Sequence, residues 1–262
     1  MKISIFFINL FIFILIIFIN YILSYYEFYS NSYTLYDNFK YSNKLTPLQI
    51  QELKKGQKKM TYMLSELTKL CRKYNIKYWL TGGSLIGVLL YKNWIPWDGD
   101  IDMCMLEEDY NILKKVKDEL PSSMWFQTLE TDPLYDRKNL PDAKIRDLKS
   151  CYLDSQDGEK WHNGLQIDIL TYKKVNNKLI SRFKYNDYQD YLYNEIFPLK
   201  TDIFDNIEVY IPNKYKTYSI KNWKYYPPQL SPISKRFPHE GIINSNKTCK
   251  YHYNLYPSIY KK

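Results

Sequence analysis

The segment Tyr78–Met105 gathers residues that could do phosphate chemistry: a Gly82-Gly83-Ser84 turn precedes Asp98, Asp100 and Asp102, which are spaced two residues apart. Because side chains alternate along a strand, Asp100 and Asp102 are expected to project from one face. Two carboxylates in one small volume repel each other unless they share a proton or a cation. Hard oxygen ligands suit Mg²⁺ or Mn²⁺, so the spacing predicts a metal-dependent phosphoryl chemistry.

A third candidate carboxylate lies further along the chain, in the predicted strand Leu165–Leu170. Ile167 and Ile169 share one face of this strand, and Asp168 lies on the other. An aspartate within an apolar strand is costly to bury without a partner. We therefore expect Asp168 to join the first two carboxylates. The alternative is a structural ion pair between Asp168 and a lysine or arginine.

The elements that must position these carboxylates follow from local patterns. Thr46 and Pro47 provide an N-cap and a first-turn proline for a helix expected to end near Asn75. The next residues predict a strand over Ile76–Leu80 and, after the glycine turn, a short buried helix over Leu85–Leu90. The free N–H groups and positive end of that helix would face the turn and form a seat for phosphate.

Downstream of the aspartates, an acidic first turn and helical spacing predict a helix over Glu107–Leu120. Strands are expected at Met124–Leu129 and Ala143–Leu148, in addition to Leu165–Leu170. This order of elements predicts an α/β (α+β) domain in which helices flank a mixed sheet. After about residue 175 the short patterns, rich in tyrosine, proline and lysine, predict no definite element.

The N-terminus carries a long apolar segment, Ile5–Leu23, interrupted only by two asparagines. It is long enough to cross a bilayer as a helix. The residues that follow, Ser24-Tyr25-Tyr26-Glu27, make a poor signal-peptide cleavage site, because bulky side chains follow the single small one, so we expect a retained signal anchor. A buried core helix is the alternative interpretation.

The flanking charges predict a single-pass type II membrane protein, because Lys2 precedes the apolar segment and acidic residues follow it. The expected organisation is a cytosolic tip and transmembrane helix over 1–24, a stem over 25–44 and a catalytic domain over 45–262. That domain would face the lumen of the endoplasmic reticulum or Golgi. The glycosylation sequon that begins at Asn246 fits a lumenal body.

The net charge of +9 is spread over single lysines and short pairs, without a long basic block. This favours attraction to anionic substrates or membrane surfaces over a nucleic-acid groove, and we expect no nucleic-acid partner. The cysteines match no zinc-binding spacing and could form up to two disulfides in an oxidising lumen. They are Cys71, Cys104, Cys151 and Cys249.

Together these motifs resemble the LicD/fukutin family, a branch of the nucleotidyltransferase superfamily. The resemblance runs from Lys58 to Pro228. It comprises a glycine/serine motif, a Trp-Asp-x-Asp-hydrophobic-Asp motif, a basic strand, a later aspartate and two C-terminal elements. These are Trp79–Gly87, Ile95–Asp102, Lys144–Asp147, Gln166–Ile169, Val209–Pro212 and Tyr225–Pro228.

The resemblance implies a nucleotidyltransferase-like fold and transfer of a phosphorylated alcohol or sugar, such as phosphocholine or ribitol phosphate. The donor would be nucleotide-activated, commonly a CDP conjugate, and the acceptor a glycan or glycoprotein. Asp100, Asp102 and Asp168 would hold one or two Mg²⁺ or Mn²⁺ ions that bridge the donor pyrophosphate and stabilise charge on phosphorus.

The remaining site residues follow the same mechanism. Gly82, Gly83 and Ser84 would seat the donor phosphates, and Asp98 or Asp168 would take the proton of the attacking hydroxyl. Lys144 and Arg146 are candidate phosphate contacts, although a solvated strand face would explain them equally well.

Two departures from the family pattern leave alternatives open. Gly99 stands where relatives often carry an acidic or bulky residue, and Ile169-Leu170-Thr171 replaces an expected hydrophobic-Phe-Pro. A pseudoenzyme that binds nucleotide or glycan without turnover would fit them. A membrane-tethered interaction protein with structural Ca²⁺ is the second alternative, but an EF-hand loop from Asp98 would place Met103 and Asp109 where Gly and Glu are required.

Overall fold

The structure, a computed structural model, describes residues 13–20, 22, 40–132, 135, 141–154, 164–182, 189–238 and 240–248. The chain forms two compact units, Met1–Phe39 and Lys40–Lys262. In the first, residues 13–20 and 22 are helical, and their large apolar side chains are exposed. In the described part of the chain, no helix combines the length and apolar character needed to span a bilayer. The predicted anchor, Ile5–Leu23, and the predicted stem lie partly outside the described residues.

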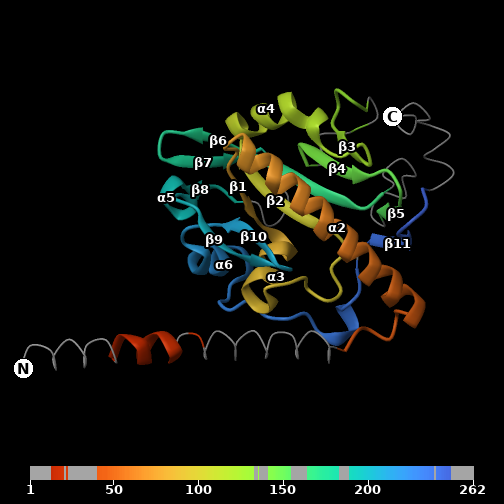
Figure 1. The fold of residues 1–262 in the computed structure, drawn as a ribbon, viewed down its shortest axis with the longest axis horizontal. Helices are drawn as coiled ribbons and strands as arrows, with labels where there is room; N and C mark the ends of the chain where they lie inside the picture. Colours follow the sequence, from red (N-terminus) through yellow and green to blue (C-terminus); the bar gives the residue numbers. More distant parts are fainter. Residues whose placement is uncertain are drawn as a thin grey trace, which may run out of the picture. The chain divides into compact units, whose positions relative to one another are not determined.

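The second unit is built on a mixed sheet (Figure 1). Strands β2 and β6 are parallel neighbours at its centre, and the remaining pairs are antiparallel. Strand β7 extends the sheet from β6, and β8 pairs with β7. The order β1-β2-β6-β4-β3 is formed by Tyr78–Leu80, Ile101–Leu106, Gln166–Val175, Ala143–Asp147 and Met124–Gln127, followed by β7 at Lys178–Ser181 and β8 at Tyr191–Leu192. The predicted mixed sheet flanked by helices is confirmed.

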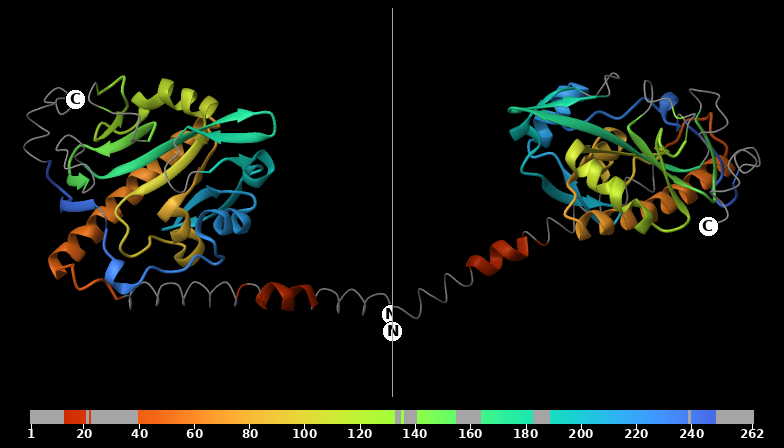
Figure 2. Two further views of the ribbon diagram at one scale, coloured as in Figure 1. Left: turned by 180° about the vertical axis from the view of Figure 1, so that it is seen from behind. Right: turned by 90° about the horizontal axis from the view of Figure 1, so that it is seen from above.

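Helix α2, Pro47–Lys73, crosses one face of this sheet, as the opposite views in Figures 1 and 2 show. It begins where the sequence predicts, because Thr46 and Gln49 form a reciprocal capping box at its N-terminus. Met60, Leu64 and Leu67 repeat at helical spacing and are fully buried, which fixes the face that packs on the sheet.

Helix α3, Gly82–Tyr91, begins three residues earlier than predicted. The Gly-Gly-Ser stretch is therefore the first turn of the helix and not a separate turn before it. Gly82 has φ +52°, and the N–H of Leu85 donates to the carbonyl of the extended N-cap Thr81. A glycine at this φ lets the chain turn from β1 directly into the helix. Helix α4, Glu107–Val116, is shorter than predicted and continues as a single 3₁₀ turn.

The chain after residue 175 contains short elements that the sequence analysis did not predict. Strand β6 runs past its predicted end because its second half pairs with β7. Buried aromatic rings hold the short elements together, as in the stacked pair Tyr191 and Tyr218, whose centroids lie 4.7 Å apart. These elements are α5 (Tyr193–Ile196), β9 (Lys200–Phe204), β10 (Ile207–Ile211), α6 (Tyr215–Trp223), η2 (Ile233–Lys235) and β11 (Glu240–Asn244), which pairs with β5 (Cys151–Asp154).

Candidate active site

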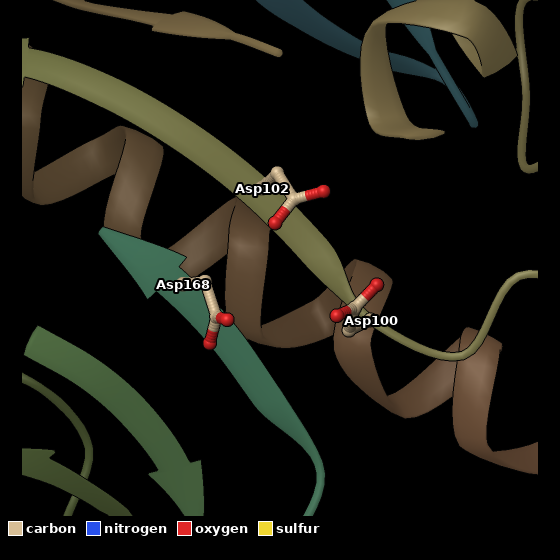
Figure 3. A group of neighbouring side chains, drawn as sticks. All are labelled: Asp100, Asp102 and Asp168. Atoms are coloured by element: carbon tan, nitrogen blue, oxygen red, sulfur yellow. The ribbon is translucent and has the colours of Figure 1, made fainter. Parts of the chain in front are cut away.

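Three carboxylates meet on the face of the sheet opposite α2 (Figure 3). Asp102 of β2 and Asp168 of β6 are direct partners in the parallel register, and Asp100 immediately precedes β2. One oxygen from each carboxylate lies within 4.8 Å of the others. The parallel pairing thus brings together residues that are far apart in the sequence and gives them a common face.

The environment of Asp168 fits a cation better than a closed ion pair. Its Oδ2 accepts from Lys144 Nζ at 3.1 Å, whereas Oδ1 is buried and has no hydrogen-bond partner among the described residues. Burial raises the pKa of Asp168, Lys144 opposes this shift and the Asp100 carboxylate adds to it. An orphaned buried oxygen beside two further carboxylates is a donor set suited to Mg²⁺ or Mn²⁺.

The first turn of α3 holds Asp102 through its backbone. The N–H of Asp102 donates to Ser84 Oγ at 2.9 Å, and the N–H of Thr81 donates to the Asp102 carbonyl at 3.2 Å. Ser84 is buried, and its hydroxyl oxygen already accepts a hydrogen bond from the backbone of β2. The first N–H groups of α3 have no acceptor within the helix, as at every helix N-terminus, and they lie beside the carboxylates.

The two glycines make room for the carboxylates. A Cβ atom at Gly82 would lie 2.3 Å from Asp102 Oδ2, and one at Gly83 would lie 2.2 Å from Asp98 Oδ2. The space that a Cβ atom would need at each glycine is occupied by the side chain of Asp102 or Asp98. Any side chain at either position would displace an aspartate.

Two residues that sequence reasoning missed fix the loop before β2. Gln57 Nε2 in α2 donates to the carbonyls of Ile95, Pro96 and Asp98, and Tyr152 OH donates to the carbonyl of Gly99 at 2.8 Å. Gln57 could have been found as a polar residue on the apolar stripe of a helix, where burial demands partners. Tyr152 carries no comparable signal.

The predicted phosphate contacts Lys144 and Arg146 are both buried. Lys144 bridges Asp168 and Gln166, whose Oε1 it reaches at 3.0 Å. Arg146 donates to Gln127 Oε1 at 2.9 Å and to the Gly164 carbonyl at 3.0 Å. The alternative of a solvated strand face is wrong for both residues. The ion pair considered as an alternative for Asp168 is present, but it occupies only one of the two carboxylate oxygens.

The two departures from the family pattern contribute none of the three clustered carboxylates, although the N–H of Gly99 donates to Asp98 Oδ1 at 3.2 Å. Gly99 contributes a backbone carbonyl to Tyr152. Thr171 donates both its N–H and its hydroxyl to Asp142 at 2.9 Å, in the wall of a separate pocket against α4 that includes none of the three site aspartates. Arg182 also donates to Asp142. This arrangement is a structural link between β4, β6 and the end of β7.

The sequon and the cysteines occupy contrasting environments. Asn246 is exposed, and Thr248 donates to the Leu148 carbonyl. Cys71 and Cys104 are buried free thiols, whereas Cys151 is disulfide-bonded. Among the described residues, one cysteine is therefore in a disulfide bond and two are buried thiols in the core.

Residues 75–214, which are 140 of the 262 in the chain, match the nucleotidyltransferase domain of the LicD/FKTN/FKRP family. The chain belongs to the LicD family. The matched residues include all three clustered aspartates and the first turn of α3. The family resemblance drawn from the motifs is therefore confirmed.

The match to each sequence relative covers only part of that relative's length. The chain is 35% identical over 118 residues to the lipopolysaccharide cholinephosphotransferase LicD of Haemophilus influenzae, covering 42% of this chain and 40% of that protein. It is 29% identical over 199 residues to an uncharacterized protein of Rickettsia prowazekii, covering 72% and 63%. The chain thus spans less than two thirds of the length of each of these relatives.

Two solved structures share a more distant likeness. The structure of ANT(2")-Ia with adenylyl-2"-tobramycin matches 64% of this chain and 79% of its own, with TM-score 0.38 and 11% identity. Lincomycin-bound LnuA, a lincosamide antibiotic adenylyltransferase, matches 61% and 81%, with TM-score 0.30 and 12% identity.

Proposed function

We propose that this chain is a metal-dependent phosphotransferase that moves a substituted phosphate group from a nucleotide-activated donor, of CDP type, onto a glycan or glycoprotein. Membership of the LicD family supports the reaction class. The single observation that carries the proposal is the cluster of Asp100, Asp102 and Asp168 with its orphaned Asp168 oxygen. Because one relative is named a cholinephosphotransferase, phosphocholine is the first group to test, before ribitol phosphate and glycerol phosphate.

Each residue has a defined task in this proposal. The three aspartates would hold Mg²⁺ or Mn²⁺, which supplies the positive charge that binds the donor pyrophosphate and stabilises the transferring phosphoryl group. The Gly83 and Ser84 amides at the N-terminus of α3 would bind donor phosphate oxygens. Asp98, half-buried against Gly83, would accept the proton of the acceptor hydroxyl. Lys144 favours the ionised form of Asp168.

The test is release of CMP by the full chain in detergent, with Mn²⁺, a glycan acceptor and each CDP donor in turn. We expect release to require metal and to disappear in Asp102→Asn, which keeps the shape of the side chain but removes its charge. Asp118→Asn is the matched control, because Asp118 is exposed and its one ion pair among the described residues is with Lys117 at 3.4 Å. Normal release by Asp102→Asn, or release unaffected by EDTA, would refute the assignment.

A pseudoenzyme that binds the donor without turning it over would give a different result in this test. CMP release would then be absent with every donor, while one donor with Mn²⁺ would still raise the midpoint of thermal unfolding. That result would establish the pseudoenzyme alternative.

We also propose that an N-terminal signal anchor holds the body in the secretory lumen. The exposed apolar helix at residues 13–20 and the exposed Asn246 support this placement. In intact microsomes we expect the body to resist added protease and Asn246→Gln to abolish a glycosidase-sensitive mass shift. Digestion of the body without detergent would refute the topology.

A further inference from the structure

Helices α2 and α3 each begin after a threonine, but the two threonines behave differently. Thr46 Oγ1 accepts from the N–H of Gln49 at 3.2 Å, as the side chain of an N-cap threonine commonly does. Thr81 precedes α3 with an extended backbone like that of Thr46, yet its side chain caps no N–H among the described residues of the helix. The uncapped helix end is the one that adjoins the carboxylate cluster.

Tyr218 of α6 engages the Thr81 hydroxyl instead. The Tyr218 hydroxyl and Thr81 Oγ1 lie 2.7 Å apart, and both side chains are buried. Burial raises the pKa of Tyr218 well above its ordinary value, so its hydroxyl stays protonated and keeps this hydrogen bond at neutral pH. The side chain that would ordinarily cap α3 is therefore bound to a different helix (Figure 1).

The neighbours of Tyr218 fix the position of its ring. The ring stacks on that of Tyr191 with a centroid distance of 4.7 Å and an interplanar angle of 19°. Tyr191 OH donates to Asn222 Oδ1 at 2.7 Å, and Asn222 Nδ2 donates to the Tyr218 carbonyl at 2.8 Å. These contacts tie the ring to its own helix and to β8, so the place of its hydroxyl is set independently of Thr81.

The uncapped amides are the ones that would bind donor phosphate in the proposed function. An N-cap threonine accepts from the second or third N–H of its helix, which in α3 are those of Gly83 and Ser84. They adjoin the cluster in which Asp168 Oδ1 has no hydrogen-bond partner among the described residues, which indicates a site completed by a ligand. The Thr81 N–H donates to the Asp102 carbonyl at 3.2 Å, and rotation of the Thr81 hydroxyl onto the helix would leave this backbone bond intact.

We infer that Tyr218 is a positioning residue that holds the Thr81 hydroxyl away from the N-terminus of α3 and keeps the Gly83 and Ser84 amides open to the phosphates of a nucleotide donor. This role rests on the proposed function, which supplies the anion, and requires no contact between Tyr218 and the donor. Without the Tyr218 hydroxyl, the Thr81 hydroxyl would lose a buried partner and turn to the uncapped amides, because a buried polar group without a partner is costly.

Amide exchange of the full chain in detergent tests this arrangement without any ligand. In Tyr218→Phe we expect at least one of the Gly83 and Ser84 amides to exchange with deuterium at least about fivefold more slowly than in the parent, because the Thr81 hydroxyl now caps it. Adding Thr81→Val should restore the parental rate, since this side chain has no oxygen with which to cap. Mass spectrometry with residue-resolving fragmentation makes the measurement, and circular dichroism shows that each variant is folded.

Calorimetric titration with CDP in saturating Mn²⁺ measures the consequence for donor phosphates. Tyr218→Phe should bind CDP about fivefold more weakly than the parent, because CDP must displace the cap, while its affinity for Mn²⁺ is kept. Thr81→Val and the double variant should both bind CDP more tightly than Tyr218→Phe. Tyr78→Phe is the matched control, because it also removes a buried tyrosine hydroxyl bonded to a threonine, Thr68 at 2.9 Å, and should change neither measurement.

The exchange and the titration can fail separately. Equal exchange of both amides in Tyr218→Phe and the parent would overturn the inference, whatever the parent binds. Equal loss of CDP affinity in Tyr218→Phe and Thr81→Val would also overturn it, because the hydrogen bond between the two residues would then serve packing alone. A parent that binds no CDP would refute the proposed donor, and the exchange rates would still decide the role of Tyr218.

Discussion

At the scale of single residues, the buried Lys144–Asp168 ion pair yields a prediction about the stability of the metal-free protein. We predict that Lys144→Met destabilises the metal-free protein by about 3 kcal/mol, because removing one partner leaves a buried carboxylate uncompensated. Saturating Mn²⁺ should recover part of this loss by supplying the missing positive charge. Urea unfolding with and without Mn²⁺ measures both effects. Lys115→Met, at an exposed position, is the control and should change stability little.

Gly82 gives a second prediction, based on space. Gly82→Ala would place Cβ 2.3 Å from Asp102 Oδ2 and impose φ +52° on a residue with a side chain. We expect it to lose Mn²⁺ binding and to cost about 1 kcal/mol of stability from backbone strain. Ser84→Ala removes one acceptor from the same turn without a clash, so it should weaken Mn²⁺ binding only modestly. Calorimetric Mn²⁺ titrations of the two variants make the comparison. Equal affinity of Gly82→Ala and the parent would contradict the geometric argument.

Sequence reasoning located the carboxylates because their signals are local. Alternation places Asp100 and Asp102 on one face, and Asp168 interrupts an apolar strand. It could not decide between a cation and an ion pair for Asp168, because Lys144 engages one oxygen of the carboxylate while the other has no hydrogen-bond partner among the described residues. The partners Gln57 and Tyr152 approach from distant elements, so only the folded chain reveals them.

At the scale of elements, the capping box of α2 yields a third prediction. Thr46→Ala should lower the free energy of unfolding by about 1 kcal/mol, because it removes the side-chain acceptor of the Gln49 N–H. Gln51→Ala, an exposed change in the same helix, should be close to neutral. Chemical unfolding of both variants tests the cap. Equal effects would show that the helix start is fixed by tertiary packing.

Elements with strong local signals were predicted, and those that depend on packing were not. Helix α2 has a cap and a long apolar stripe, and in the sequence of β4 apolar and charged residues alternate. The start of α3 was misplaced because Gly-Gly-Ser is a turn signal by propensity. The elements after β6 are too short for periodicity to identify, since buried aromatic contacts between them define their structure.

At the scale of the whole molecule, the two core cysteines should report global unfolding. Burial raises the pKa of Cys71 to about 12 and holds that of Cys104 well above its ordinary value. At pH 8 neither thiol ionises in the folded protein, whereas an unfolded cysteine has a pKa of about 8.5. We therefore predict that iodoacetamide labels them only as the chain unfolds in urea, as mass spectrometry would show.

Metal provides the control for that measurement. Mn²⁺ should slow labelling of the parent protein and have no effect on Asp168→Asn, because only the intact cluster gains stability from the ion. Rapid labelling of the native protein would contradict the buried placement of both thiols.

The position of β6 has a consequence for how the chain is made. The ribosome synthesises β1, β2, β3 and β4 before β6, yet β6 lies between β2 and β4 in the sheet. The nascent chain must therefore keep two incomplete half-sheets apart until their central strand emerges. A polypeptide truncated before Gln166 would expose the inner edges of both halves, and such edges pair readily with other chains. Completion of the carboxylate cluster and protection from aggregation thus occur in the same late step of biosynthesis.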